Sequence, residues 1–456
     1  MADMRRARLR SAIVLLATVH AATGCGRPAP AAQEKGLAAQ RRQDLGAFER
    51  LFFESDRSYS AAARLEARKR LEDLKASPDS PSDARFILAL SQIVALADNG
   101  HSGIFYRGPS PSLGRVGLRL APFGEEFIVV QAEATHADLA GGRLVAVDGH
   151  ALADLRAAAR TLAGGPPQRR DRTASVFLES PGQLHALGLA KEPGQAMYRF
   201  EMPGGAIREA RLPVTSPPGS GQDASMAVLS PEKALAGWRT LLAVEKAPWA
   251  LRDIDEDFRR RDLPEADATL IQLRLNADGK GPILPFLEEA EAAGRKAGRS
   301  NVLLDMRMNG GGNLQLTQEW MSGLPKRLPR NGRVAVLLGP WTFSAAISSV
   351  GYLKQAGGDR VILVGEPPGD RLNFFAEGRP FALPNSGAVI LMATERHDYL
   401  TGCRPYRDCH KYVAEHPIAV VSLDPEVKAP WTIEAYAAGR DPGMEAAIAV
   451  LGRRPH

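Results

Sequence analysis

The sequence lacks the motifs that mark several common classes of enzyme and binding protein. It has no phosphate-binding loop, no dinucleotide-binding fingerprint and no HExxH zinc motif, so it predicts neither a nucleotide nor a catalytic zinc. Its net charge is only +6 over 456 residues, and no basic stripe is interleaved with aromatic residues. We therefore expect no cofactor, no metal and no nucleic-acid partner.

Cysteine is also scarce, with three residues in the whole chain. Cys403 and Cys409 lie in one polar loop, and in an exported protein such a pair favours a disulfide. A metal site that includes His397 and His410 is the alternative. We expect the disulfide, because the spacing of these residues matches no familiar zinc pattern.

The N-terminal apolar stretch, residues 11–17, is too short to cross a bilayer as a helix. Basic residues precede it and small residues follow it, as in an export signal. The segment Ala22-Thr-Gly-Cys25 resembles a bacterial lipoprotein box, although alanine stands at position 22 in place of leucine. We expect residues 1–25 to be a lipoprotein signal in which Cys25 carries the lipid. An ordinary secretory signal is the alternative.

Both alternatives predict an exported protein of the bacterial cell envelope, either anchored to the membrane by a lipid or periplasmic. Residues 26–44 are rich in proline, alanine and glutamine and have no apolar period. Such a composition predicts a tether that holds the folded body away from the membrane.

The folded body is predicted to have three parts. Residues 45–107 place apolar side chains at helical spacing, which predicts a small helical bundle. Residues 108–214 are expected to form short strands, a helix and a hairpin, followed by a linker over residues 215–247. Within residues 248–456, strands alternate with helices, which predicts an α/β domain with a parallel or mixed sheet.

Residues 139–149 (LAGGRLVAVDG) resemble a segment of PDZ domains. A PDZ-like region can take up a peptide by adding a strand at a sheet edge. A spacer without an open groove is the alternative, and the sequence does not decide between them.

The most informative stretch is residues 301–349. A short apolar strand precedes Asn309-Gly-Gly-Gly312, and a second apolar strand ends shortly before Ser344. Three glycines let the backbone approach another group closely. A serine at the start of a helix has free backbone N–H groups beside it, which suits a nucleophile and an oxyanion hole. Serine at such a position is more often an N-cap.

Taken in this order, the pieces resemble the tail-specific, or C-terminal-processing, serine peptidase family, including the tricorn protease core. The resemblance rests on Asp305-x-Arg307-x-Asn309-Gly-Gly-Gly312 and on Thr342-Phe-Ser344-Ala-Ala, and continues in Gly365-Glu-Pro-Pro-Gly369 and Gly439-Arg-Asp-Pro442. It covers roughly residues 248–451. It implies an α/β catalytic domain with a mixed sheet of the ClpP/crotonase kind, behind an N-terminal helical bundle and a PDZ-like domain.

The resemblance also implies an activity, the hydrolysis of peptide bonds by Ser344 through an acyl-enzyme. One arrangement in the family pairs the serine with a lysine, but the turn after residues 361–364 contains none. Lys354 lies nearly three turns along the same expected helix, too far to turn back to Ser344. The other arrangement uses a histidine in a D-G-H-T turn, which Asp98-Asn-Gly-His101-Ser resembles. We expect His101 to be the base.

The remaining roles follow the family less closely. The oxyanion is expected to be bound by the backbone N–H of Ala345 and of Gly311 or Gly312. Tricorn-type relatives have a catalytic glutamate at an offset that falls on Ala419 here. We expect Glu415, the nearest glutamate upstream, to be the third catalytic residue, with Glu395 as the other candidate.

The predicted function is that of an envelope-anchored serine endopeptidase that acts on a peptide or protein substrate. A catalytically silent relative that binds peptides or apolar ligands is the alternative, favoured by the alanine at position 419 and the altered turn around Asn99. A hydrolase of non-peptide esters or amides would use the same site with a different pocket.

Overall fold

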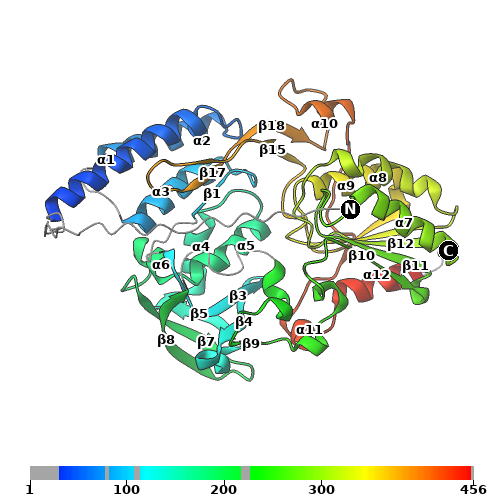
Figure 1. Ribbon diagram of the computed structural model, residues 1–456, viewed down its shortest axis with the longest axis horizontal. Coiled ribbons are helices and arrows are strands. Elements are labelled where there is room, and N and C mark those ends of the chain that lie inside the picture. The colour runs from blue at the N-terminus through cyan, green and yellow to red at the C-terminus, as the bar shows by residue number, and fades with distance from the viewer. Residues whose placement is uncertain (1–29, 78–81, 107–112, 217–225, 453–456) are drawn as a thin grey trace, which may run out of the picture.

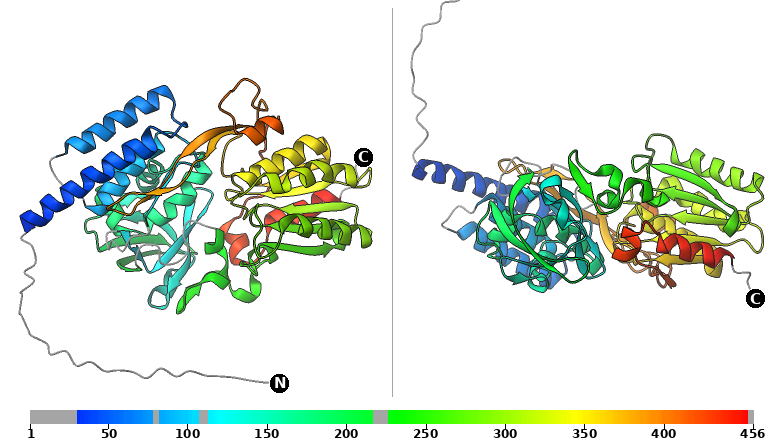
Figure 2. Two further views of the ribbon diagram at one scale, coloured as in Figure 1. Left: turned by 45° about the horizontal axis from the view of Figure 1, so that its top comes forward. Right: turned by 90° about the horizontal axis from the view of Figure 1, so that it is seen from below.

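The computed structural model describes residues 30–77, 82–106, 113–216 and 226–452. The described chain forms a helical part, a middle part built on a curved sheet, and a C-terminal α/β part that lies beside the other two (Figure 1). Two further views show the same division, with the α/β part at one end of the molecule (Figure 2). The predicted signal and Cys25 lie outside the described residues.

The helical part contains three helices and a π-helical turn that share one apolar core. Its elements are α1 (Pro30–Phe48), η1 (Glu49–Phe53), α2 (Ala61–Ala76) and α3 (Asp83–Ala95). Where an irregular tether is predicted, the chain is therefore helical from residue 30. Alanine, glutamine and arginine favour a helix. The helix is also held by a contact with a distant segment, because Asp44 near its end accepts hydrogen bonds from the backbone N–H groups of Asn385 and Ser386 at 2.8 and 2.9 Å.

The middle part is an eight-stranded antiparallel sheet with the order β2-β8-β7-β5-β4-β3, in which β6 pairs with β5 and β9 with β4. Three helices pack against its core. The strands are β2 (Arg115–Val116), β3 (Leu118–Phe123), β4 (Glu126–Glu133), β5 (Arg143–Val147), β6 (His150–Ala151), β7 (Gln195–Glu201), β8 (Ile207–Ser216) and β9 (Trp238–Thr240), and the helices are α4 (Leu152–Arg160), α5 (Pro167–Leu178) and α6 (Pro181–Ala186).

The C-terminal part is built on a six-stranded sheet with the order β10-β11-β12-β13-β14-β19. The pair β10–β11 is antiparallel and the other pairs are parallel, so the sheet is mixed, as expected. Strands β11, β12 and β13 are buried along their whole length. The strands are β10 (Phe258–Leu263), β11 (Ala268–Leu273), β12 (Asn301–Asp305), β13 (Val334–Leu338), β14 (Val361–Gly365) and β19 (Val427–Lys428).

Helices cover both faces of this sheet. On one face, α7 (Ile283–Lys296), α8 (Gln315–Arg327) and α9 (Ala345–Gly357) enclose the larger core. On the other face, α12 (Pro442–Gly452) packs against the strands. The short helix α11 (Ile433–Ala437) lies between the C-terminal part and the middle part. This arrangement brings the segments after β12 and β13 to one edge of the sheet, since parallel strands end at the same edge.

A long excursion, residues 373–398, leaves the C-terminal part and reaches the helical part; we call it the arm (Figure 1). Its base is the antiparallel pair β15 (Asn373–Glu377) and β18 (Ala393–Asp398). Its tip contains β16 (Phe381–Ala382) and β17 (Val389–Leu391), and β17 pairs with β1 (Gly103–Phe105) of the helical part. Leu383, Ala388 and Ile390 of the tip lie in the helical core. The predicted domain of residues 248–456 is therefore interrupted, because the arm buries its apolar tip elsewhere.

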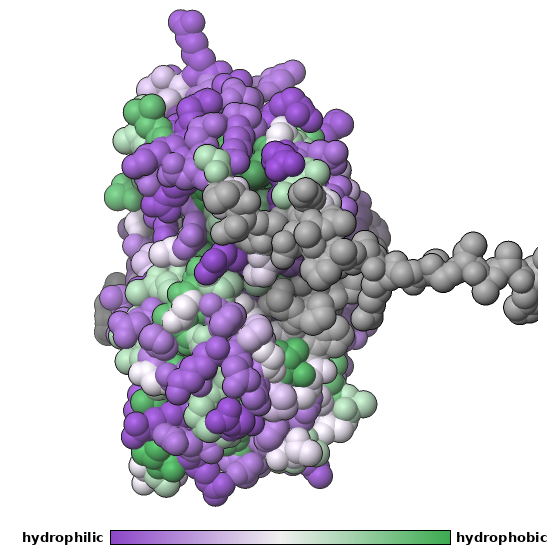
Figure 3. All heavy atoms as spheres, turned by 90° about the vertical axis from the view of Figure 1, so that its left-hand side faces the viewer, coloured by the Kyte–Doolittle hydropathy of each residue, from purple (hydrophilic) through white to green (hydrophobic). Residues whose placement is uncertain are grey.

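The described surface is mixed in character. On the face shown in Figure 3, hydrophobic residues occur in small groups separated by hydrophilic ones. None of the helices in the described residues is long and apolar enough to span a membrane.

Candidate active site

Ser344 occupies a sharp turn between β13 and α9. Its backbone has φ 55° and ψ −127°, and its side chain makes no capping hydrogen bond to the helix. This conformation is rare for a residue with a side chain and costs about 1–3 kcal/mol. Ser344 is therefore not an ordinary N-cap. A strained serine at a strand-to-helix turn presents its hydroxyl group at the end of the sheet, the arrangement known as a nucleophile elbow.

The glycine run after β12 lies directly against this serine. Gly311 has φ +102°, and a Cβ atom there would be 2.6 Å from the Cβ of Ser344 and 3.1 Å from the nitrogen of Ala345. Only glycine permits this approach. The N–H of Gly311 donates to Oδ1 of Asn309 at 3.0 Å, so it is engaged in this conformation. Ala345 is the first residue of α9, where a helix supplies no acceptor for the N–H group.

A buried amide network fastens the glycine run to α9. Asn276 Nδ2 donates to Ser349 Oγ at 2.7 Å and to Thr317 Oγ1 at 2.9 Å, and Asn276 Oδ1 accepts from Asn309 Nδ2 at 2.8 Å. Asn276, Asn309 and Thr317 are fully buried. Buried polar groups that are fully bonded define a single geometry, and here that geometry sets the distance between the glycine run and Ser344.

A buried ion-pair cluster connects two of the sequence motifs. Arg307 Nη2 lies 2.9 Å from Asp305 Oδ2, and its Nη1 lies 2.6 Å from Asp441 Oδ1. Burial alone would raise the pKa of Asp305, but the Arg307 guanidinium outweighs it and holds that pKa below its usual value. Removing one partner from such a cluster leaves an uncompensated buried charge. The cluster therefore anchors α12 to the strand end from which the glycine run departs.

His101 lies in the turn after α3 and is sandwiched between two aromatic rings. Its ring centre is 4.2 Å from that of Phe343, the residue before Ser344, and 4.8 Å from that of Phe374 in β15. Asn99 holds the turn in place, because its side chain accepts from the N–H of Phe375 and donates to the carbonyl of Phe375, both at 3.0 Å. The structure thus brings His101 to the loop of Ser344.

The carboxylate beside His101 belongs to Asp370. Its Oδ2 lies 3.2 Å from His101 Nδ1, its side chain is 1% exposed, and its Oδ1 accepts from the N–H of Arg371 at 2.9 Å. A Cβ atom at Gly100 would be 2.5 Å from Asp370 Oδ2, so the glycine before His101 gives the carboxylate room. The Nδ1–Oδ2 contact has ion-pair distance but not hydrogen-bond alignment.

The two halves of the site are adjacent but not yet joined by a hydrogen bond. His101 Nε2 is buried and has no hydrogen-bond partner among the described residues. The ring of His101 stacks on the ring of Phe343, the residue before Ser344. The two side chains must come into hydrogen-bond contact before a proton could pass between them.

Known proteins resemble this chain at the level of fold. No family model and no curated protein matches it. Mature CPAF complexed with lactacystin aligns with a TM-score of 0.58 and 14% identity, over 91% of this chain and 98% of that chain. A serine-to-alanine mutant of CPAF aligns with a TM-score of 0.60 and 13% identity, over 92% and 97%. The chain has the fold of CPAF.

The likeness to CPAF extends over nearly the whole chain, but at this identity it concerns the fold alone. The photosystem II D1 C-terminal processing protease also aligns, with 16% identity over 91% of this chain and 97% of that chain. Its TM-score of 0.39 is too low to support an argument.

Within this CPAF-like fold, the structure does not bring the predicted glutamates to His101. Glu415 ends the short helix α10 (Lys411–Glu415), where its exposed carboxylate lies 3.8 Å from Lys411 Nζ. Glu395 lies on β18 opposite Ala376. Sequence reasoning missed Asp370 because it sought a glutamate near the C-terminus. The signal was the turn of residues 365–371, where the lysine of the other catalytic arrangement was sought and an aspartate stands.

The histidines considered for a metal site form part of a ring column in the CPAF-like fold. His397 stacks on Phe374 at 5.0 Å and on His410 at 5.3 Å between ring centres, and its Nε2 lies 3.3 Å from Glu377 Oε1. Burial lowers the pKa of His397, and the contact with His397 holds the pKa of Glu377 below its usual value. Cys403 and Cys409 are joined in a disulfide with an S–S distance of 2.10 Å.

Proposed function

We propose that this protein is a serine endopeptidase in which Ser344 is the nucleophile, His101 the general base and Asp370 the residue that orients His101. One observation carries the proposal. A strained serine is held against a glycine run, and the residue before it, Phe343, stacks on a histidine whose Nδ1 faces a buried carboxylate. The likeness in fold to CPAF supports it.

The chemistry is acyl transfer. His101 Nε2 accepts the proton of the Ser344 hydroxyl group, and Oγ attacks the peptide carbonyl carbon. The histidine then returns the proton to the leaving amine, and a water molecule releases the acyl group by the reverse path. Asp370 holds the proton on Nδ1 and stabilises the imidazolium that forms. Its burial suits this role, because a charge interaction is stronger where water is excluded.

The negative charge on the carbonyl oxygen needs backbone donors. The N–H of Ala345 is one, and the N–H of Gly311 or Gly312 supplies the second. Gly311 would have to release Asn309 Oδ1 on substrate binding. Loss of one oxyanion-hole donor typically raises the barrier by about 2.7–4 kcal/mol.

The wider context of the activity belongs to the same proposal. The N-terminal signal supports export and a lipid on Cys25, so the enzyme would act at the bacterial cell envelope. The helices of residues 30–95 would form an N-terminal bundle, and the middle sheet would be a PDZ-like domain. A peptide or protein is the expected substrate.

The decisive experiment is labelling of the protein from residue 26 onward with a fluorophosphonate, which reacts with activated serines. We expect the wild type to be labelled and Ser344→Ala and His101→Ala not to be. Ser348→Ala is the matched control, since Ser348 lies one turn further along α9 and donates to or accepts from Tyr399. Labelling that survives in Ser344→Ala would refute the assignment. An unlabelled, folded wild type would favour a silent peptide-binding relative.

A further inference from the structure

Two arginines of α5 lie against the loop that leads into Ser344. The guanidinium carbon of Arg169 is 4.2 Å from the ring centre of Phe343, and that of Arg172 is 5.9 Å from the ring centre of Trp341. Arg172 Nη1 also donates to the carbonyl of Pro340 at 3.1 Å. Residues 340–343 immediately precede the nucleophile, so both positive charges border the place where a substrate would bind.

In the part of the chain that the structure describes, neither arginine forms an ion pair. Arg172 Nε is buried without a hydrogen-bond acceptor among those residues. Burial, together with the neighbouring charge of Arg169, lowers the pKa of Arg172 to about 9. Asp370 is the carboxylate that acts on both, but it lies beyond ion-pair distance and faces His101. Both side chains are half-buried, and a charge withdrawn from water without a counter-ion is unfavourable, so the pair would be stabilised by an anion.

Neighbouring arginines of α4 and α5 are paired with carboxylates. Asp171 of α5 accepts two hydrogen bonds each from Arg156 and Arg160. Arg170 lies 2.5 Å from a carboxylate oxygen of Asp98. The positive charges of these three arginines are thus neutralised. Positive charge is left unneutralised where α5 meets the loop of Ser344.

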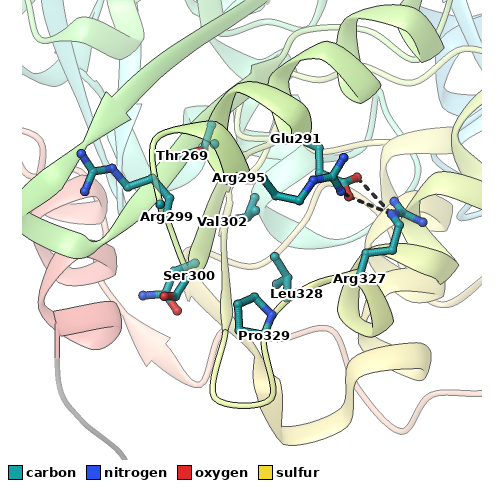
Figure 4. A pocket seen from close by; sticks show the side chains of 12 residues that line it. Thr269, Glu291, Arg295, Arg299, Ser300, Val302, Arg327, Leu328 and Pro329 are labelled. Carbon is teal, nitrogen blue, oxygen red and sulfur yellow. Dashed lines mark hydrogen bonds and ion pairs between the residues drawn. The ribbon is translucent and has the colours of Figure 1, made fainter.

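A pocket elsewhere in the molecule gives a second contrast (Figure 4). It has a volume of about 480 Å³ and lies near the start of β12, at the sheet edge opposite the Ser344 turn. Its arginines are paired, because Glu291 binds both Arg295 and Arg327, while Asp262 binds Arg299. This pocket therefore shows no need for an anion, although it is rich in arginine.

The position of α5 is fixed by the two loops of the candidate site. Gln168 Nε2 donates to the carbonyl of Pro368 at 2.7 Å, just before Asp370, and Arg172 donates to Pro340 before Ser344. A Cβ atom at Gly100 would lie 3.1 Å from Cδ of Arg169, so the turn of His101 leaves space for this side chain. The two guanidinium groups are thus held relative to all three residues of the proposed triad.

We propose that Arg169 and Arg172 form a subsite for a carboxylate of the substrate, next to the bond that Ser344 attacks. This inference rests on the proposed peptidase function. A guanidinium binds a carboxylate through two parallel hydrogen bonds, which gives both affinity and orientation. The carboxylate belongs either to an aspartate or glutamate side chain or to the end of the substrate chain. The enzyme then prefers peptides that place a negative charge close to the cleavage site.

The test uses a mixture of synthetic decapeptides of random sequence, prepared once with a free C-terminal carboxylate and once with a C-terminal amide. Cleavage sites are identified by mass spectrometry for the wild type, Arg169→Gln, Arg172→Gln and Arg172→Lys. Arg295→Gln is the charge-matched control, because it removes the same charge in the distant pocket. Each variant is also labelled with the fluorophosphonate, which carries no carboxylate.

We expect the wild type to cut at sites with a nearby carboxylate about tenfold more often than elsewhere, the scale of a charged hydrogen bond. The preference should fall to near unity in both glutamine variants and be retained in Arg295→Gln, which should also be labelled at the wild-type rate. Arg172→Lys should retain part of it, because the charge remains without the fork. Preference in the amide library identifies an acidic side chain, and preference confined to free ends identifies the chain terminus.

Two results would overturn the subsite. One is a labelled, active wild type without any preference for carboxylates. The other is a preference that persists in both glutamine variants. An unlabelled wild type would instead contradict the peptidase function itself, so the two failures are distinguishable.

Discussion

Ser344 and His101 are held in place by different kinds of interaction. The serine is fixed by backbone geometry. Its φ is strained, Gly311 packs so closely that a Cβ atom there would lie 2.6 Å from the Cβ of Ser344, and the buried network of Asn276 holds the surrounding segments. The histidine is fixed by side chains that come from other segments, with Phe343 and Phe374 on its faces and Asp370 at Nδ1.

This difference separates what is rigid in the site from what can adjust. Bonded backbone and a satisfied buried network permit one arrangement. Stacked rings can slide or tilt at small cost, since a ring pair contributes only about 0.5–1.5 kcal/mol beyond its buried area. The movement that joins His101 to Ser344 should therefore occur on the histidine side, while the strained turn of Ser344 stays still. Four predictions test this division.

The largest effect is expected at the carboxylate on the histidine side. Asp370→Asn should slow fluorophosphonate labelling by about 10²–10⁴-fold, because an amide can stabilise the wrong tautomer of His101 and does not stabilise the imidazolium. The matched controls are Glu415→Gln and Glu395→Gln, which should label at the wild-type rate. A large loss in either control, with little loss in Asp370→Asn, would reassign the acid.

The next effect is expected on the serine side. Gly311→Ala places a methyl group against Ser344 and forces a side chain into φ +102°, which should destabilise the protein by about 1–3 kcal/mol and slow labelling by about 10²-fold. Gly310→Ala is the matched control, since nothing lies within 4 Å of a Cβ atom there. Chemical denaturation and labelling measure both variants. Normal labelling of Gly311→Ala would show that the glycine run is not rigid.

A smaller effect, of opposite sign, tests the strain at the nucleophile. Ser344→Gly should raise the free energy of unfolding by about 1 kcal/mol, because relief of about 1–3 kcal/mol of strain exceeds the 0.5–1 kcal/mol entropy cost of glycine. Ser344→Ala keeps the Cβ atom and should not stabilise the protein, although both variants lose labelling. If alanine and glycine give equal stability, the turn is not strained.

The smallest effect concerns pH and the ring column. Because burial lowers the pKa of His397, the folded state binds its proton less readily than the unfolded chain does. Its contribution to stability is complete above about pH 6.5 and declines as the pH falls below that value. His397→Gln should therefore reduce the loss of Tm between pH 7.5 and pH 5.5. The exposed His416→Gln should leave that loss unchanged, and an identical loss in both variants would contradict the argument.

Part of the structure could be predicted from the sequence because it depends on contiguous motifs. The mixed α/β fold is confirmed, as alternating strands and helices already indicated. The glycine run and Ser344 each follow a buried strand, and the parallel order of β12 and β13 brings the two strand ends together. Their adjacency follows from local pattern and sheet geometry alone.

Other parts could not be predicted, because they join segments that are distant in the sequence. The residues around Asp370 in the sequence do not indicate that it faces His101. The stacking of His101 on Phe343 and Phe374 likewise leaves no periodic pattern in the sequence from which it could be predicted. The arm falls within the predicted C-terminal domain because it is contiguous with that domain in the sequence. Its strand β17 nevertheless pairs with β1, in a register that joins Gly103 to Leu391 and Phe105 to Val389. Single-sequence patterns identify strands but not their partners.

The arm also has a consequence for how the molecule can be divided. An interruption of the chain between β9 and β10 would give two polypeptides that divide the helical core between them. The first would lack Leu383, Ala388 and Ile390, which fill the helical core, and the second would expose them. Production of the C-terminal part alone should yield an unstable protein, whereas co-production of both pieces should restore the fold by fragment complementation. The arm therefore couples the stability of the helical part to that of the C-terminal part.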